Sequence, residues 1–246
     1  MFIEMFSKAK RAAKIKKAAD AYNQRLLDDK DFALKESSEP YSAYIQEWFP
    51  KTTTPIKVLE LGCGPGRYIS ILQHFNCHIV GVDPCYFDTW DSYKECSNVT
   101  LQDKIKAENL PFADESFDFV VCLSALLYFD DPDKAFQEIY RVLKPKGRLA
   151  LRTVNVKNLY TSFTGKRLDP ASKKLYLKEE LVSLLGKHKF LIKKYFSYGF
   201  YSPIFPNYYW YIHNVFLSFN MQKKLSSLVP ESRGLSHHFF AEKPGS

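Results

Sequence analysis

The apolar residues of this chain form short runs that are separated by charged and turn-forming residues. Runs bounded by Gly, Pro, Asn or Asp are typical of strands in a buried sheet. They predict strands over Lys57–Leu61, His78–Asp83, Val99–Gln102, Phe119–Leu123 and Arg148–Thr153. Apolar residues at helical spacing predict helices over Arg67–Phe75 and Pro132–Val142, with a loop or short helix near Trp90.

The flanking segments carry further elements. Helices are predicted ahead of the first strand, over Lys8–Leu27 and Tyr41–Trp48. Pro145 and Gly147 predict a turn into the fifth strand. Beyond that strand the pattern predicts in turn a loop, a helix, a strand, a helix and a strand, over Asn155–Lys174, Lys178–Lys187, Phe190–Tyr201, Asn207–Leu228 and Ser236–Glu242.

The alternation of strands and helices predicts a fold class. It is typical of α/β proteins with a doubly wound, mostly parallel sheet and helices on both faces. Ligands of such proteins bind outside the carboxyl ends of the strands. Glu60, Asp83, Ala107 and Leu123 all fall at predicted strand ends or just beyond them.

The segment VLELGCGPGRYI, residues 58–69, carries the most informative local chemistry. An apolar strand ends near Glu60 and then turns through Gly62, Gly64 and Gly66 into a helical segment. Glycine allows positive φ and a close approach of ligand to backbone, so this turn predicts a pocket for a nucleoside cofactor. A dinucleotide fingerprint would need glycine in place of Arg67, and the lysine and hydroxyl residue of a phosphate loop are missing. Asp83, after the second strand, is the type of carboxylate that binds ribose hydroxyls.

Composition adds bounds on class and compartment. With 246 residues, of which 46% are apolar, the chain predicts a globular domain with an appended element. The five cysteines include no CxxC pair. They predict free thiols, no metal site and a reducing, cytoplasmic location.

The formal net charge of +8 leaves two interpretations open. A nucleic-acid surface is one, and a soluble basic surface, favoured by the scattered lysine pairs, is the other. The N-terminal segment reads as a basic amphipathic helix and lacks the apolar core of a secretory signal. Packing on the sheet is expected for it, with peripheral membrane contact as the alternative.

Three ordered segments carry a family resemblance between Val58 and Thr153. They are ELGCGPG, AENLPFADESFDF and IYRVLKPKGRLAL. Together they resemble class I S-adenosylmethionine (SAM) dependent methyltransferases of the type 11 branch. The resemblance implies a Rossmann-like seven-stranded sheet, mostly parallel, with an antiparallel C-terminal edge hairpin. It divides the chain into an N-terminal helical cap (1–50), a SAM-binding core (51–154) and a C-terminal part of the same domain (155–246) that roofs an acceptor pocket.

The resemblance also implies roles for residues. Glu60 would meet the methionine amino end of SAM, the glycine turn would pass beneath the cofactor, and Asp83 would hold the ribose. The full predicted cofactor set is Glu60, Gly62, Cys63, Gly64, Gly66, Asp83, Pro84, Ala107, Glu108 and Leu123. Lys106 departs from the family, which usually has an acid there facing the adenine amino group. Asp103 or Glu108 could replace that acid, or adenine could be held by backbone and packing.

The methyl acceptor is less defined. Direct displacement needs chiefly alignment, and a general base would help with a hydroxyl or acidic carbon. Tyr128, Asp130 and His213 are weak candidates, and Asp130 and Asp131 could instead cap the next helix. The aromatic segment Tyr201–Phe219 is interrupted by Pro and Asn, which argues against a membrane span. It is either packing or a wall for an aromatic or lipid-like acceptor.

The sequence therefore predicts a SAM-dependent methyltransferase that acts on a small molecule. A tRNA-modifying methyltransferase is the first alternative, because it would explain the positive charge. A non-catalytic SAM-fold binding protein is the second. An NAD-dependent enzyme is disfavoured by the glycine spacing.

Overall fold

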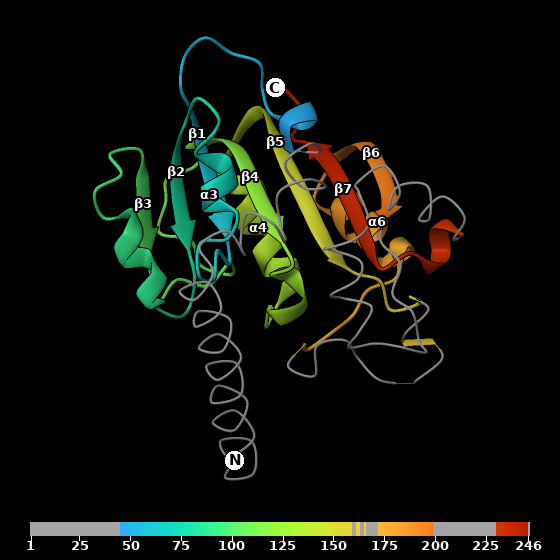
Figure 1. Ribbon diagram of the computed structural model, residues 1–246. Coiled ribbons are helices and arrows are strands. Elements are labelled where there is room, and N and C mark those ends of the chain that lie inside the picture. Colours follow the sequence, from blue (N-terminus) through green and yellow to red (C-terminus); the bar gives the residue numbers. More distant parts are fainter. Residues whose placement is uncertain (1–44, 159–160, 163–164, 166–171, 199–229, 246) are drawn as a thin grey trace.

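The computed structural model describes residues 45–158, 161–162, 165, 172–198 and 230–245 (Figure 1). Residues 45–48 are helical, which agrees with the end of the predicted helix Tyr41–Trp48. The predicted helices Lys8–Leu27 and Asn207–Leu228, the aromatic segment Tyr201–Phe219 and His213 lie outside the described residues.

The described residues form one seven-stranded sheet with the strand order β3-β2-β1-β4-β5-β7-β6. Its strands are β1 (Ile56–Leu61), β2 (Cys77–Val82), β3 (Val99–Gln102), β4 (Phe117–Leu123), β5 (Leu143–Val154), β6 (Leu191–Tyr198) and β7 (Ser236–Glu242). Strands β1 to β5 are parallel to one another, whereas β7 pairs antiparallel with both β5 and β6. The predicted mostly parallel sheet with an antiparallel C-terminal edge pair is confirmed.

Short and long helices connect these strands. They are α3 (Ile69–Leu72), the 3-10 helices η1 (Asp88–Tyr93) and η2 (Leu126–Tyr128), α4 (Pro132–Val142), α6 (Lys178–Lys187) and the 3-10 helix η3 (Glu231–Arg233). The predicted bounds of α4, α6, β3 and β7 are confirmed, and η1 is the short helix expected near Trp90. Asp131 is the N-cap of α4, because its Oδ1 accepts a hydrogen bond from Lys134 N at 3.1 Å.

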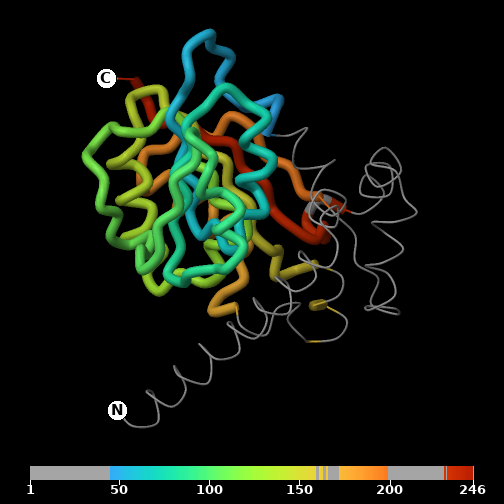
Figure 2. Tube along the Cα trace, turned by 60° about the vertical axis from the view of Figure 1, so that its left-hand side comes forward, coloured from blue at the N-terminus to red at the C-terminus, as the bar shows by residue number. Residues whose placement is uncertain are grey.

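The two faces of the sheet bury separate apolar clusters. Leu59, Val120 and Leu149 belong to the cluster that includes residues of α4 and α6. Val58, Val121 and Ala150 alternate with them along the strands and belong to the cluster that includes α3. Helices thus cover both faces, as the doubly wound fold requires (Figures 1 and 2).

Two predicted elements differ most from the structure, and strands β1, β2, β4 and β6 begin one or two residues from their predicted starts. The helix predicted over Arg67–Phe75 is only the single turn of α3. Beyond it the amides of His74 and Phe75 bond to carbonyls three residues back, which ends the α-helix in tighter turns. Ahead of it, Gly66 has φ +87° and belongs to the loop.

The fifth strand also differs, because it begins at Leu143 and not at Arg148. Leu143 pairs with Phe117 and Arg148 with Phe119, so the intervening residues bulge out of β5. Gly147 is needed inside this bulge, because a Cβ there would lie 2.7 Å from the Lys144 carbonyl oxygen. The turn chemistry of Pro145 and Gly147 therefore produces a bulge within the strand.

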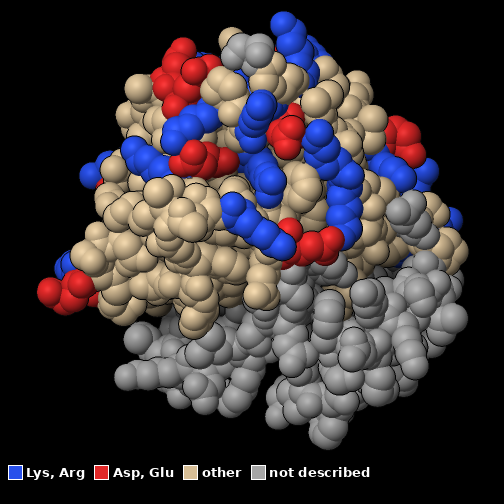
Figure 3. All heavy atoms as spheres, turned by 90° about the horizontal axis from the view of Figure 1, so that it is seen from above, with Lys and Arg blue, Asp and Glu red and all other residues tan. Residues whose placement is uncertain are grey.

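Basic side chains gather at the end of the sheet where the parallel strands begin (Figure 3). Acids are interspersed among them. The ion pairs at this end are Lys144 with Asp118 at 2.7 Å, Lys194 with Glu47 at 2.6 Å, and Lys193 with Glu242 and Lys243 with Glu115, both at 3.4 Å. Among the described residues, this basic surface lies at the end of the sheet opposite the glycine turn.

Among the described residues, no helix is long and apolar enough to cross a bilayer.

Candidate cofactor and acceptor site

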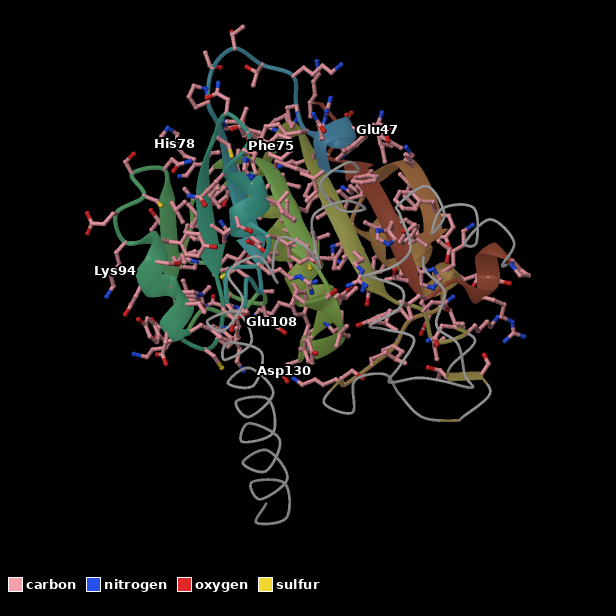
Figure 4. The ribbon with its side chains drawn as sticks, viewed as in Figure 1. Glu47, Phe75, His78, Lys94, Glu108 and Asp130 are labelled. Carbon is pink, nitrogen blue, oxygen red and sulfur yellow. The ribbon has the colours of Figure 1, made fainter. Side chains whose placement is uncertain are left out.

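The predicted site residues come together at the carboxyl ends of β1, β2 and β4. Glu60 is in register with Gly81 of β2 and with Val121 of β4, so the three strand ends lie side by side. Figure 4 shows Glu108 and Asp130 at this edge and Glu47 and His78 at the opposite end. Most of the predicted cofactor set therefore surrounds one edge of the sheet.

The turn of residues 62–66, here called the glycine loop, begins with two hydrogen bonds to β2. The Val82 carbonyl accepts from the amides of Gly62 and Cys63 at 2.8 and 3.1 Å. Gly62 has φ +66°, and a Cβ there would lie only 2.4 Å from Ala125 Cβ. Gly64 has φ +51° and open space around the position of a Cβ. At position 62 both the positive φ and the close approach of Ala125 require glycine. At position 64 only the positive φ favours glycine, and there is space beside the loop.

Alanine substitutions at Gly62 and Gly64 are expected to separate the cost of the positive φ from the cost of the contact with Ala125. Gly64→Ala should cost about 1 kcal/mol from the left-handed backbone alone. Gly62→Ala should cost at least about 1 kcal/mol more, because Ala125 and its helix must shift. Urea unfolding of both variants measures the difference, and equal losses would contradict the packing role of Gly62.

Glu60 is the most unusual group at the site. Its side chain is 1% exposed, and within the part of the chain that the structure describes its Oε2 has no hydrogen-bond partner. Burial, and then repulsion by Asp83, raise the pKa of Glu60 well above its ordinary value. A buried carboxylate oxygen without a donor is costly unless a ligand supplies one. The site is therefore prepared for a cationic or hydrogen-bond-donating group.

Asp83 follows β2 and binds the glycine loop. Its Oδ2 accepts from Gly64 N at 3.0 Å and its Oδ1 from Cys85 N at 2.9 Å. Burial raises the pKa of Asp83, and these two amide bonds act in the opposite direction. Each carboxylate oxygen keeps further acceptor capacity, which a pair of ribose hydroxyls could use. Pro84, beside it, is exposed.

Lys106 forms an ion pair with Asp130 at the same edge of the sheet. Its Nζ lies 2.9 Å from Asp130 Oδ2, and Lys173 Nζ contacts the other oxygen, Asp130 Oδ1. Glu108 Oε1 accepts from the amides of Asp130 and Asp131, at 2.7 and 3.1 Å. These two bonds use one carboxylate oxygen of Glu108, and Ala107 beside it in sequence is buried.

The LPF segment after Ala107 is fixed by one arginine of α4. The Arg141 guanidinium donates to the carbonyls of Leu110 and Phe112, at 3.0 and 2.7 Å, and to the carboxylates of Asp114 and Glu138. Glu138 in turn accepts from Leu110 N at 2.9 Å. The arginine and the LPF motif, distant in sequence, thus form one hydrogen-bonded unit at the adenine side.

The three predicted base candidates fare differently. Tyr128 is partly exposed at the end of η2. Asp130 contacts the ammonium groups of Lys106 and Lys173, so both of its carboxylate oxygens are engaged in ion pairs. His213 lies outside the described residues.

A polar cluster that sequence reasoning missed lies beside β4 and β5. Arg152 is in register with Leu123 and with His238, and its Nη1 donates to Ser124 Oγ. Ser124 has φ +67°, an uncommon backbone for serine that is often found at functional sites. Arg152 directly after the apolar run of residues 149–151 was the available sequence signal.

His238 completes this cluster. It is 3% exposed, and its Nε2 lies 2.9 Å from Ser236 Oγ. Phe196 stacks on its ring with centroids 4.7 Å apart. Burial, and then the charges of Arg152 and His237, lower the pKa of His238 well below its ordinary value. The imidazole is therefore neutral near pH 7, and the same causes make it a weak base.

Two buried hydroxyls lie beyond the carboxyl end of β4. Thr153 Oγ1 and Tyr176 OH have no hydrogen-bond partner among residues 45–158, 172–198 and 230–245, and burial raises the pKa of Tyr176 to about 12. Such groups are rare in interiors because their desolvation is uncompensated. They are candidate contacts for a polar acceptor.

Among the described residues, no three His, Cys, Asp or Glu side chains are arranged to hold a metal ion. The five cysteines are free thiols.

Comparison with known proteins identifies related sequences. Residues 59–151 match the profile of the type 11 family described as a methyltransferase domain. The chain is 35% identical over 100 residues to YcgJ, an uncharacterized methyltransferase of Bacillus subtilis (strain 168), a match that covers 39% of each protein. It is 27% identical over 120 residues to sterol 4-C-methyltransferase strm-1 of Caenorhabditis elegans, covering 47% of this chain and 36% of the relative. The matches span less than half of these curated relatives.

The fold is similar to that of a solved SAM-dependent methyltransferase, a possible histamine N-methyltransferase, from Thermotoga maritima. The TM-score is 0.61 at 23% identity, covering 91% of this chain and 95% of that one. The strand order and the antiparallel strand pair are those of the Rossmann-like methyltransferase fold.

Proposed function

We propose that the protein transfers a methyl group from SAM to a small-molecule acceptor, and that residues 59–151, which match the type 11 methyltransferase domain, carry this activity. The observation that carries the proposal is the buried Glu60 Oε2, which has no hydrogen-bond partner among the described residues, at the start of a glycine loop that leaves space at Gly64. An ammonium group is the ligand chemistry that such an oxygen favours.

The residues at this edge fit SAM part by part. Glu60 would accept from the methionine ammonium, and the glycine loop leaves room for the ligand to approach its backbone near Gly64. Asp83 would accept from the ribose hydroxyls with the lone pairs that Gly64 N and Cys85 N leave available. Adenine would rest against Ala107 and the LPF segment that Arg141 fixes.

Two tasks could fall to the chain's own residues: orienting the acceptor atom and, for a hydroxyl or acidic carbon, accepting its proton. SAM supplies an activated methyl group, so a protein needs chiefly to orient the acceptor atom for displacement. The hydroxyls of Thr153 and Tyr176 would orient a polar acceptor at the carboxyl ends of the strands. His238, buried and hydrogen-bonded to Ser236, has a lowered pKa and is therefore a weak base, so the proposal relies on alignment of the acceptor and assigns no general base.

A small-molecule acceptor is favoured over tRNA by the placement of charge. The basic surface of Figure 3 lies at the opposite end of the sheet, so RNA bound there would be remote from the glycine loop. The sterol specificity named for the nematode relative supports an apolar acceptor class. The aromatic composition of the segment Tyr201–Phe219, which lies outside the described residues, is consistent with such an acceptor.

The test is methyl transfer from SAM carrying a labelled methyl group. The panel contains aromatic hydroxyl compounds, sterols, lipid-linked glycans and tRNA transcripts, each incubated with wild-type protein and with the Asp83→Ala variant. We expect label in a small molecule with wild-type protein and strongly reduced label with the variant. Label in tRNA alone would replace the proposal with the RNA-modifying alternative.

A further inference from the structure

Helix η1 binds the glycine loop through three side-chain donors. Thr89 Oγ1 donates to the Pro65 carbonyl at 2.8 Å. Trp90 Nε1 donates to the Gly64 carbonyl at 2.7 Å. Tyr93 OH donates to the Gly66 carbonyl at 3.0 Å. Three successive carbonyls of the loop are therefore held by one short helix that follows β2.

The loop has a specific need for such support. Gly64 and Gly66 both have positive φ, and glycine backbones lose more conformational freedom on ordering than any other residue. The helix that follows, α3, is one turn long and has no side-chain cap. The side-chain donors of η1 therefore restrict the backbone of the loop, which its own residues do not hold in place.

Gly66 and Tyr93 also fit one another sterically. A Cβ on Gly66 would lie 2.8 Å from Tyr93 Cε2, so the ring occupies the space that a side chain would need. The hydroxyl of the same tyrosine then bonds the Gly66 carbonyl. Because C=O and N–H of a trans peptide point to opposite sides, this bond turns the Arg67 amide away from η1.

The bonds between η1 and the glycine loop are connected to Asp83, the residue predicted to bind the ribose. Asp83 accepts from Gly64 N on the loop and from Cys85 N on the segment that leads into η1. Trp90 is buried and packs on Tyr86 and Phe87, with ring centroids 5.5 and 6.0 Å away. The loop, Asp83 and η1 form one connected unit.

We propose that η1 is a positioning element for the cofactor loop, and that Thr89, Trp90 and Tyr93 hold this loop in its ligand-binding conformation before a ligand arrives. Preorganised binding groups raise affinity because the ordering cost is met in the free protein. The identity of the ligand as SAM rests on the proposed function, whereas the ordering of the free loop does not.

Tyr93→Phe and Trp90→Phe test the proposal, since each removes a donor and keeps an aromatic ring. In the absence of ligand, we expect hydrogen exchange of the loop amides from Gly64 to Tyr68 to accelerate about threefold or more in both variants. Amides of β4 and β5 should keep their protection. Calorimetry with S-adenosylhomocysteine, the demethylated product of SAM, should show a dissociation constant raised about three- to tenfold.

Two matched variants control for the loss of a ring substituent. Tyr140→Phe changes a tyrosine of α4 that packs on Phe190 and Lys243. Trp48→Phe changes a tryptophan whose Nε1 has no hydrogen-bond partner. Both should leave loop exchange and the dissociation constant unchanged.

The outcomes separate the inference from the proposed function. Unchanged loop exchange in Tyr93→Phe and Trp90→Phe would overturn the positioning role, whatever the ligand. Normal exchange in β4 and β5 with faster exchange in the loop would support it even if S-adenosylhomocysteine failed to bind wild-type protein. That failure would overturn the proposed function alone.

Discussion

Replacing Asp83 with alanine is expected to weaken the binding of SAM by at least about tenfold, because hydrogen bonds to a charged group contribute roughly 1.5 to 3 kcal/mol. The variant loses the predicted acceptor for the ribose hydroxyls. It also frees Gly64 N and Cys85 N, which the carboxylate holds at 3.0 and 2.9 Å. Calorimetric titration of SAM into wild-type and variant protein measures the effect.

Asp118→Ala is the matched control for this prediction. Asp118 also accepts one backbone amide, that of Lys57 at 2.9 Å, and it pairs with Lys144. It lies at the end of the sheet where the strands begin, away from the glycine loop. Asp118→Ala should therefore leave SAM affinity unchanged. Equal affinity of wild type and Asp83→Ala would reject the ribose role.

Replacing Glu60 with glutamine is expected to weaken SAM binding and to stabilise the free protein. Affinity should fall by about tenfold or more, since a charged hydrogen bond to the methionine ammonium becomes neutral. The free protein should gain stability because burial without a partner on Oε2 disfavours the carboxylate. Opposite signs for binding and stability are the signature of a group kept for its ligand.

The stability difference should depend on pH in a defined direction. The pKa of Glu60 is raised in the folded state, so the folded protein binds more protons than the unfolded chain above the ordinary glutamate value. Its contribution to stability is present at low pH and is lost as pH rises toward the folded pKa. Urea unfolding at about pH 5 and about pH 8 should show the advantage of Glu60→Gln growing with pH.

Glu115→Gln serves as the control, because Glu115 is an exposed carboxylate that pairs with Lys243. It should change neither affinity nor the pH dependence. A Glu60→Gln variant that binds SAM as tightly as wild type would exclude Glu60 as the ammonium partner. A variant that is less stable at every pH would show that the carboxylate supports the fold.

Local patterns determined most of the fold. The glycine loop, helices α4 and α6 and strands β3 and β7 follow from apolar spacing and turn residues within each segment. The length of α3 could not be predicted from apolar spacing, because the positive φ of Gly66 and the three-residue hydrogen bonds after Leu72 shorten the helix. The bulge of β5 could not be predicted from its own residues either, because it depends on pairing with Phe117 and Phe119 of β4.

The candidate site divides in the same way. Glu60, the glycines and Asp83 belong to contiguous motifs, so spacing alone located them. His238 and Arg152 become neighbours only through the antiparallel pairing of β5 and β7, which no local pattern encodes. Asp130 was proposed as a base from its position, yet its contacts with Lys106 and Lys173 depend on three separate loops.

The most direct test of the central claim is a calorimetric titration of SAM and S-adenosylhomocysteine into the purified wild-type protein, with NAD as the control ligand. The account predicts binding of both SAM forms in about the micromolar range, near −8 kcal/mol, and no binding of NAD. Binding of NAD without SAM, or of neither, would contradict the assignment of this edge of the sheet to SAM.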